Sequence, residues 1–290
     1  MVKTLPQAEF YRHNHGGSRT GRAMVFPCAD GAWAAGLHPH IRQAYRGTSL
    51  WLSVAGVGDA RYNAARNEHV ASGRPVACWD MGYLGKSKDL INCYVRVSIN
   101  TDHPTHAMMD MTPSDPSRWL ALRDSKMFND VYVPDGPVVV LGMGPKFHSY
   151  LGEHDWETKA LHAAAARFPR RKIIYRPKPN SKAPPGRPID AVVWPHISLD
   201  STLRKVLKGA SLMICRHSNA AVEACILGVP VECEGGAAHW LYHRGANPTE
   251  AERMDFLHRV CWWQWRFREM GPAWQFLVAM EAKLRVAGAL

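Results

Sequence analysis

The sequence predicts an α/β fold made of two Rossmann-like domains that face a cleft. Short apolar runs of strand length alternate with longer helix-forming stretches, the pattern of parallel sheets with crossover helices. Residues 110–137, rich in Pro, Asp and Ser, interrupt this alternation and show little periodicity. A chain of 290 residues is long enough for two cores of ordinary size. We therefore expect an N-terminal domain over residues 1–136 and a C-terminal domain over residues 137–290.

The composition is that of a water-soluble globular protein, with 46% apolar and 21% charged residues. No apolar run reaches the roughly 20 residues of a membrane span. The first residues lack the apolar core of a secretory signal, so we expect a cytoplasmic protein, in the host cytoplasm if the source is viral. The seven cysteines form no CxxC pair and predict reduced, buried thiols rather than a disulfide framework or a zinc site. Nothing in the sequence indicates the oligomeric state.

The net charge of +11 favours a polyanionic partner, either nucleic acid or an anionic membrane surface. Lysine and arginine that serve only solubility remain an alternative. Charge alone therefore does not identify a substrate.

In the N-terminal domain, residues 1–22 are polar, basic and glycine-rich, which predicts a flexible arm or phosphate-contacting loop with a disordered start. The pattern then predicts strands over 23–26, 49–55, 76–79 and 93–99, and helices over 41–45 and 60–72. Asp30 and Asp80 follow two of these strands. In open α/β sheets ligands bind beyond the carboxyl ends of the strands, so both aspartates are candidate site residues.

The C-terminal domain repeats the alternation more regularly. Its apolar runs predict strands over 138–141, 172–175, 211–215 and 231–233, and helices over 156–168, 198–207, 220–227, 250–265 and 272–286. Gly142, Gly144 and Lys146 follow the first strand, and Arg176 and Lys178 follow the second. A Gly-x-Gly turn is a weak signal by itself, but these cations at strand ends are suited to neutralising phosphate groups.

The third strand of this domain leads into Arg216, His217, Ser218 and Asn219. Ser218 or Asn219 is a good N-cap, so we expect free N–H groups of the first helical turn, with Arg216 and His217 beside them, to bind an anion. Glu223, one turn into the helix, is placed to accept hydrogen bonds from ribose hydroxyls. These features predict a nucleoside diphosphate ligand. The pattern alone equally describes an ordinary β-α-β unit with Ser218 as a structural cap.

The amino-acid sequence of residues 218–231 provides a further argument. Ser-Asn-Ala-Ala-Val-Glu-Ala at 218–224 and Gly-Val-Pro-Val at 228–231 resemble the donor-binding segment of GT-B-type glycosyltransferases. Sugar-nucleotide 2-epimerases carry a similar segment on the same fold. The resemblance implies a nucleotide sugar as co-substrate, for which we expect a UDP-sugar, no metal or other cofactor, and C-terminal helices that cross back to the N-terminal domain. The donor-binding candidates are Gly142, Gly144, Lys146, Arg176, Lys178, His217, Ser218, Asn219 and Glu223.

Two short segments resemble segments of small phage-type glycosyltransferases: Asp-Met-Gly-Tyr at 80–83 and Tyr-Arg-Pro-Lys-Pro at 175–179. Some enzymes of that kind sugar-coat hydroxymethylated pyrimidines in viral DNA. This resemblance and the basic charge together imply duplex DNA as the acceptor, which requires base flipping or groove distortion. The acceptor-binding candidates are Arg12, Arg19 and Arg22.

An inverting transfer needs a general base for the acceptor hydroxyl. Asp80 is the first candidate and Asp30 the second, and a turn or cap role is the alternative for each. A lipopolysaccharide- or capsule-type glycosyltransferase and a nucleotide-sugar 2-epimerase remain open as functions. A non-catalytic nucleic-acid-binding protein would not need the donor segment.

Overall fold

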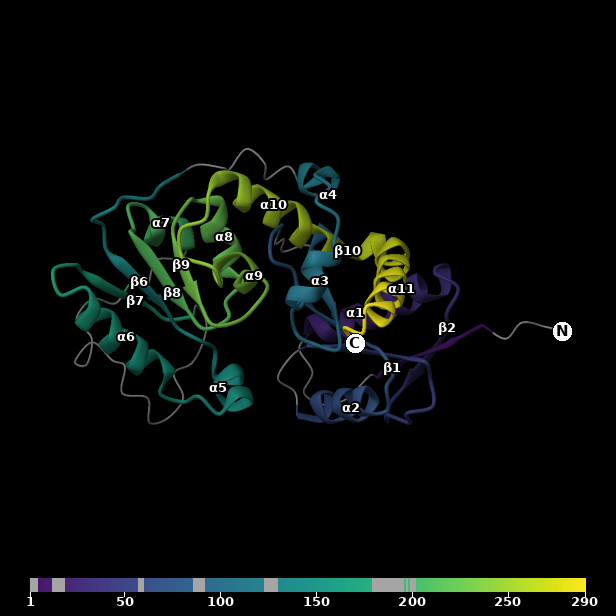
Figure 1. The fold of residues 1–290 in the computed structure, drawn as a ribbon. Coiled ribbons are helices and arrows are strands. Elements are labelled where there is room, and N and C mark those ends of the chain that lie inside the picture. The colour runs from purple at the N-terminus through teal and green to yellow at the C-terminus, as the bar shows by residue number, and fades with distance from the viewer. Residues whose placement is uncertain are drawn as a thin grey trace. The chain divides into compact units, whose positions relative to one another are not determined.

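The computed structural model describes residues 5–11, 19–56, 60–85, 92–122, 130–178, 196, 198 and 202–290. Contacts within the chain divide it into two compact units, one formed by residues 1–122 with 258–290 and the other by residues 123–257 (Figure 1). This division lies upstream of the domain boundary predicted at residue 136. It also groups the last residues of the chain with the first unit. Among the described residues, no helix combines the length and apolarity needed to span a membrane.

The first unit contains a six-stranded mixed sheet in the order β10-β5-β4-β3-β1-β2. Strands β1 to β4 run parallel, whereas β5 is antiparallel to both β4 and β10. The prediction of a purely parallel sheet is therefore wrong for this unit. The strands are β1 (Gln7–Tyr11), β2 (His38–Arg42), β3 (Trp51–Ala55), β4 (Val76–Met81), β5 (Tyr94–Ile99) and β10 (Gln264–Arg266). The α-helices are α1 (Arg19–Ala34), α2 (Ala60–Ala71), α3 (His106–Met111), α4 (Ser117–Ala121) and α11 (Met270–Val286).

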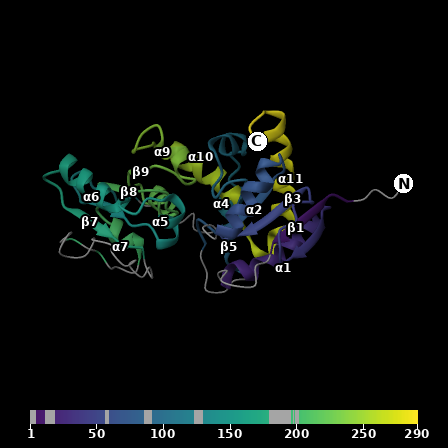
Figure 2. The same ribbon diagram turned by 90° about the horizontal axis from the view of Figure 1, so that it is seen from below.

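Helix α11 supplies the centre of this unit's core. The Trp274 indole packs against the rings of Phe10, Trp51 and Trp79 at centroid distances of 5.8, 5.5 and 5.7 Å, and its Nε1 donates to the Cys28 carbonyl at 2.8 Å. Helix α1 lies beside α11 (Figure 2). A Cβ at Gly31 would lie 2.5 Å from the Met270 backbone, so this close approach requires glycine. Helix α2 covers the other face through residues such as Tyr62.

Four predictions for the first 45 residues are wrong. Residues 23–26 lie in α1 rather than in a strand, because a four-residue apolar run fits either period; Met24 and Cys28 are buried at helical spacing while Phe26 is exposed. Asp30 therefore lies on an exposed helix face, not at a strand end. Residues 41–45 form the end of strand β2 and a loop, not a helix. Residues 7–11, which the sequence placed in the polar arm, form β1, an interior strand between β2 and β3.

The second unit contains a four-stranded, wholly parallel sheet in the order β7-β6-β8-β9. All four strands were predicted; they are β6 (Val138–Leu141), β7 (Ile173–Arg176), β8 (Leu212–Cys215) and β9 (Val231–Cys233). The helices are α5 (Pro145–Leu151), α6 (Trp156–Arg167), α7 (Leu203–Leu207), α8 (Ala220–Ile226) and α9 (His239–Tyr242). Helix α10 (Glu250–Val260) ends before the predicted limit of residue 265, and a 3₁₀ turn leads into β10. The helix predicted over 198–207 is described only as the short α7.

The strand order of the second unit contains a switch point. The chain leaves β6 toward β7 on one side and leaves β8 toward β9 on the other. Helices α5 and α6 lie on one face of the sheet and α7 and α8 on the opposite face (Figure 1). The connections after β6 and β8 therefore diverge, and open α/β sheets bind ligands at such a switch point, beyond the carboxyl ends of the strands.

Candidate functional site

The turn after β6 packs tightly against the end of β7. Gly142 N–H donates to the Arg176 carbonyl at 2.9 Å, and a Cβ on Gly142 would lie 2.6 Å from Tyr175 Oη. A Cβ on Gly144 would lie 3.2 Å from Lys178 Cδ, so the Lys178 stem passes over Gly144. Close packing thus explains why both positions are glycine. The two glycines let two of the predicted donor-binding segments approach each other.

Phe147 joins the turns after β6, β7 and β8. Its ring centroid lies 4.1 Å from that of His217, which follows β8, and 5.7 Å from Lys178 Nζ, which follows β7. Lys178 is exposed, whereas Phe147 and His217 are half-buried. Arg176, at the last position of β7, is only 8% exposed and so has little access to solvent. The structure therefore brings Lys178 and His217 together across the switch point, with Phe147 between them. Phe147 was not predicted as a site residue.

Asn219 is the N-cap of α8 and makes no side-chain cap bond, whereas the Oγ of Ser218, one residue earlier, accepts a hydrogen bond from Ala220 N–H at 3.1 Å. The next two amides, of Ala221 and Val222, donate to the carbonyls of Ser218 and Asn219 at 3.0 and 3.1 Å. The prediction that the first-turn N–H groups are free for an anion is wrong for these three amides. Glu223 is half-buried one turn along α8, where the sequence placed it.

Arg216 is held between two carboxylates. Its guanidinium donates to both Glu153 carboxylate oxygens at 2.8 and 3.0 Å and lies 3.3 Å from Glu234 Oε2. The bond to Arg216 lowers the pKa of the Glu153 carboxyl. The expected contribution of Arg216 to an anion site is therefore offset, and Arg216 instead ties together segments that follow α5, β8 and β9.

A second turn covers the Arg216 segment. Glu234 N–H donates to the Arg216 carbonyl at 3.0 Å, and a Cβ on Gly236, whose φ is +82°, would lie 3.2 Å from the His217 carbonyl oxygen. Gly235 and Gly236, which follow the predicted strand over 231–233, are the sequence signal that could have indicated this close approach.

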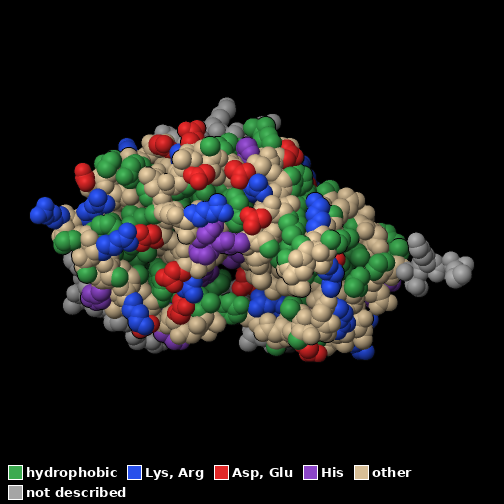
Figure 3. All heavy atoms as spheres, in the orientation of Figure 1, with side chains coloured by type: hydrophobic (Ala, Val, Ile, Leu, Met, Phe, Trp, Pro, Cys, Tyr) green, Lys and Arg blue, Asp and Glu red, His purple; other side chains and the backbone are tan. Residues whose placement is uncertain are grey.

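Histidine side chains gather beside basic ones on the face shown in Figure 3. In α9, the His239 and His243 rings lie 6.0 Å apart, and Arg244 Nε donates to His243 Nε2 at 3.3 Å. Burial lowers the pKa of His239, and the nearby His243 and Arg216 lower it further. These histidines follow the carboxyl end of β9 and were not predicted as site residues.

A buried polar pair lies beneath the turn after β6. Glu157 of α6 and His148 of α5 are each only 1% exposed, and His148 Nε2 lies 2.7 Å from Glu157 Oε1. The same oxygen accepts a hydrogen bond from Met143 N–H at 2.9 Å. Burial raises the pKa of the Glu157 carboxyl. Nothing in the sequence pattern distinguished this pair from surface residues of two helices.

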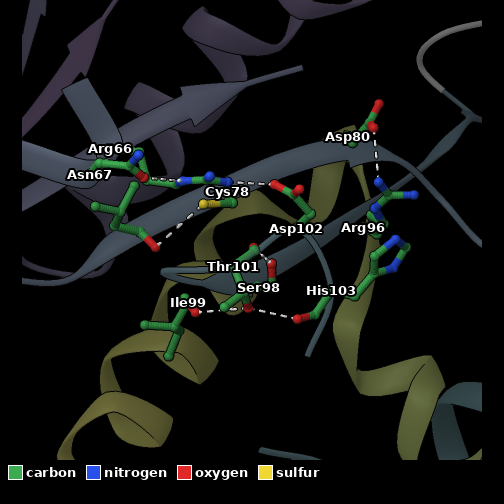
Figure 4. Close-up of polar contacts among 11 residues, drawn as sticks. Arg66, Asn67, Cys78, Asp80, Arg96, Ser98, Ile99, Thr101, Asp102 and His103 are labelled. Atoms are coloured by element: carbon green, nitrogen blue, oxygen red, sulfur yellow. Dashed lines mark hydrogen bonds and ion pairs between the residues drawn. The ribbon is translucent and has the colours of Figure 1, made fainter. Parts of the chain in front are cut away.

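The first candidate base, Asp80, lies in β4 of the first unit (Figure 4). Its Oδ2 accepts from Arg96 Nη2 at 2.9 Å, and its Oδ1 accepts from Met81 N–H at 2.8 Å. Arg96 is nearly buried and also lies over the Tyr83 ring at 5.8 Å. Each Asp80 oxygen thus has one partner and keeps a second lone pair that can accept a proton. The second candidate, Asp30, lies on the exposed surface of α1.

The remaining predicted residues are only partly described. Arg12 lies outside the described residues. Arg19 and Arg22 belong to the start of α1 rather than to a flexible arm, and Lys146 to the start of α5; the side chains of all three are outside the described part. Within the described residues, no group of three or more His, Cys, Asp or Glu side chains is arranged to hold a metal ion.

The mixed α/β fold, with a parallel sheet whose switch point is lined from three strand ends, is typical of nucleotide-binding proteins. No family model and no curated protein matches the sequence. Two solved structures from Thermosulfurimonas dismutans are similar in fold, both from KpsC. Its β Kdo 2,7 transferase superposes with a TM-score of 0.54 at 13% identity, covering 94% of this chain and 99% of that one. Its β Kdo 2,4 transferase has a TM-score of 0.52 at 13% identity, covering 87% and 90%. The protein thus shares the fold of these sugar transferases.

Proposed function

We propose that the protein is a glycosyltransferase that binds a nucleotide sugar at the carboxyl edge of β6, β7 and β8. The observation that carries this proposal is the convergence of Lys178, Phe147 and His217 from three strand ends at the switch point. The fold shared with two Kdo transferases supports it. In this proposal the donor lies in the second unit, with its phosphate next to Lys178 and its ribose next to Glu223.

Sugar transfer breaks the bond between the anomeric carbon and a phosphate oxygen, so negative charge develops on the leaving phosphate. Lys178, exposed at the strand end, is the residue best placed to stabilise that charge. We propose that side chains supply this stabilisation without a metal ion, and that a UDP-sugar is the donor. Sugars are also activated on nucleoside monophosphates, so binding assays need both UDP and CMP, each with and without a chelator.

Lys178→Gln is expected to weaken nucleotide binding about 10- to 150-fold, the loss of one charge-assisted contact to phosphate. Isothermal calorimetry with UDP and CMP measures this. Lys208→Gln is the matched control, because Lys208 is also exposed but lies before the amino end of β8. An equal loss in both variants would show that only general charge is involved, and no loss in Lys178→Gln would move the phosphate site elsewhere.

For the acceptor we propose a hydroxyl group of a glycan, because both similar structures are Kdo transferases. The second candidate is a hydroxymethylated pyrimidine of phage DNA, which the net charge of +11 favours. In either reaction the acceptor hydroxyl loses a proton as its oxygen bonds to the anomeric carbon, and Asp80 is the proposed base for that proton.

The two acceptors predict different salt dependence. If DNA is the acceptor, duplex affinity is expected to fall with salt at a slope near −0.9 per phosphate contact, and replacing Arg12, Arg19 and Arg22 with glutamine should flatten that slope. Filter binding or fluorescence anisotropy at several salt concentrations measures it. A flat dependence in the wild type removes DNA, whereas a steep slope that survives the triple substitution removes these arginines as the contacts.

A further inference from the structure

The buried pair of His148 and Glu157 is arranged around a single proton. His148 Nδ1 faces the Glu153 carbonyl, which can only accept, so Nδ1 carries a hydrogen and donates it. The 2.7 Å contact between His148 Nε2 and Glu157 Oε1 then needs one further proton on either atom, because two bare acceptors at that distance repel. Glu157 Oε1 must also accept from Met143 N–H. One oxygen thus serves two partners on different segments.

This pair fixes the backbone direction of the turn after β6. Met143 N–H points inward to Glu157, and Gly142 N–H is used by the Arg176 carbonyl. Since the peptide is trans and planar, the Gly142 carbonyl points away from the direction of Met143 N–H. The turn is therefore held by buried hydrogen bonds, and these two amides do not contact a phosphate.

The same pair connects to the turn after β8. His148 bonds to the backbone of Glu153, and the Glu153 carboxylate binds Arg216, the residue before His217. Arg216 also contacts Glu234, which accepts from Trp156 Nε1 at 3.0 Å at the start of α6. A continuous set of polar contacts thus runs from Glu157 to both sides of the switch point.

We infer that Glu157 and His148 are positioning residues of the nucleotide site. They hold the turn after β6 and, through Glu153 and Arg216, the turn after β8, so that Phe147, His217 and Ser218 keep their places around the nucleotide. This inference rests on the proposed function, since it assigns the pair a role in that same site. Neither residue touches the ligand, and both act through the turns they hold.

Glu157→Gln keeps the size and shape of the side chain but replaces one acceptor oxygen with an NH₂ donor. Glutamine carries no negative charge to hold a second proton on the buried ring, so His148 is neutral with its hydrogen on Nδ1. If the amide oxygen then accepts from Met143 N–H, it faces the His148 Nε2 lone pair; if the amide turns over, its NH₂ group faces Met143 N–H. One of the two contacts is therefore lost. Nucleotide affinity is expected to fall about tenfold, the equivalent of one lost buried hydrogen bond. Amide hydrogen exchange of the free protein is expected to speed up over residues 142–148 and also over residues 215–219.

Two further variants define the test. Glu232→Gln makes the same chemical change at the partly exposed ion pair with Arg167 in the same unit, and it should leave affinity and exchange at both turns unchanged. Glu153→Gln, at a more exposed position, leaves the buried pair in place and weakens only the link to Arg216. It should speed up exchange at residues 215–219 alone and weaken binding several-fold. It also keeps the inference testable if Glu157→Gln does not fold.

Calorimetry uses whichever of UDP and CMP binds the wild type more tightly. If the wild type binds the nucleotide and both Glu157→Gln and Glu153→Gln bind it with the same affinity, the inference is overturned and the proposed function stands. Faster exchange at residues 142–148 but not at 215–219 in Glu157→Gln contradicts the coupling of the two turns. Failure of the wild type to bind either nucleotide overturns the proposed function, and the positioning role with it.

Discussion

Replacing Trp274 with alanine is expected to lower the free energy of unfolding of the first unit by about 3–5 kcal/mol. The indole is fully buried, contacts three aromatic side chains from β1, β3 and β4, and donates to the Cys28 carbonyl. The substitution removes a large apolar surface from the core, leaves a cavity and deprives that carbonyl of its donor. Because Trp274 lies close to the C-terminus, the same result would show that the last helix is part of the first unit's core.

Denaturant unfolding followed by circular dichroism measures this loss. Trp33→Ala is the matched control, since Trp33 is 57% exposed and its removal should change stability by less than about 0.5 kcal/mol. An effect of Trp274→Ala as small as that of the control would contradict the packing of α11 on the sheet.

Stability is expected to fall as the pH drops from about 6.5 to about 4, through His69. This side chain is fully buried; Tyr45 Oη lies 3.0 Å from its Nδ1, and its Nε2 lies 3.3 Å from the Leu50 carbonyl. The carbonyl only accepts, so Nε2 carries the hydrogen and the neutral ring accepts from Tyr45. Burial lowers the pKa of His69 to about 4, against an ordinary value near 6.5.

The sign follows from where the proton binds. Between the two pKa values, His69 binds a proton in the unfolded chain but not in the folded protein. Its contribution to the free energy of unfolding is therefore intact above pH 6.5 and lost progressively as the pH falls toward 4. A difference of this size amounts to about 3 kcal/mol. Unfolding free energies of the wild type and His69→Gln at pH 7.5, 6, 5 and 4.5 test it. The wild-type curve should fall more steeply, and parallel curves would exclude His69 as the group responsible.

The second unit was largely predictable from the sequence. Its four strands are short apolar runs that end in glycine or charged residues, as expected for parallel strands buried on both faces. The residues that follow these strands are set by topology, so the strand pattern alone was enough to assign Lys178 and His217 to one edge of the sheet. The tight turn at the start of α8 could not be assigned in this way, because its local hydrogen bonds depend on backbone angles that composition does not specify.

The fold of the first unit was harder to predict from the sequence, because buried polar residues interrupt its hydrophobic pattern. Glu9 is fully buried in β1, where its Oε1 accepts from Arg46 N–H, and this acidic residue hid an interior strand. Strand β10 completes the sheet from the other end of the chain by pairing with β5. Glu157 escaped prediction for a similar reason: an acidic residue in the first turn of a helix is expected to face solvent. Only tertiary contacts show that it lies beneath the turn after β6.

The central claim is that the carboxyl edge of the second unit's sheet binds the nucleotide of a sugar donor. Amide hydrogen exchange of the wild type, with and without saturating UDP or CMP, tests it most directly. The account predicts slower exchange in the ligand-bound protein over residues 142–148, 176–178 and 215–223, which follow β6, β7 and β8. Protection confined to other parts of the chain, or no protection with either nucleotide, would contradict it.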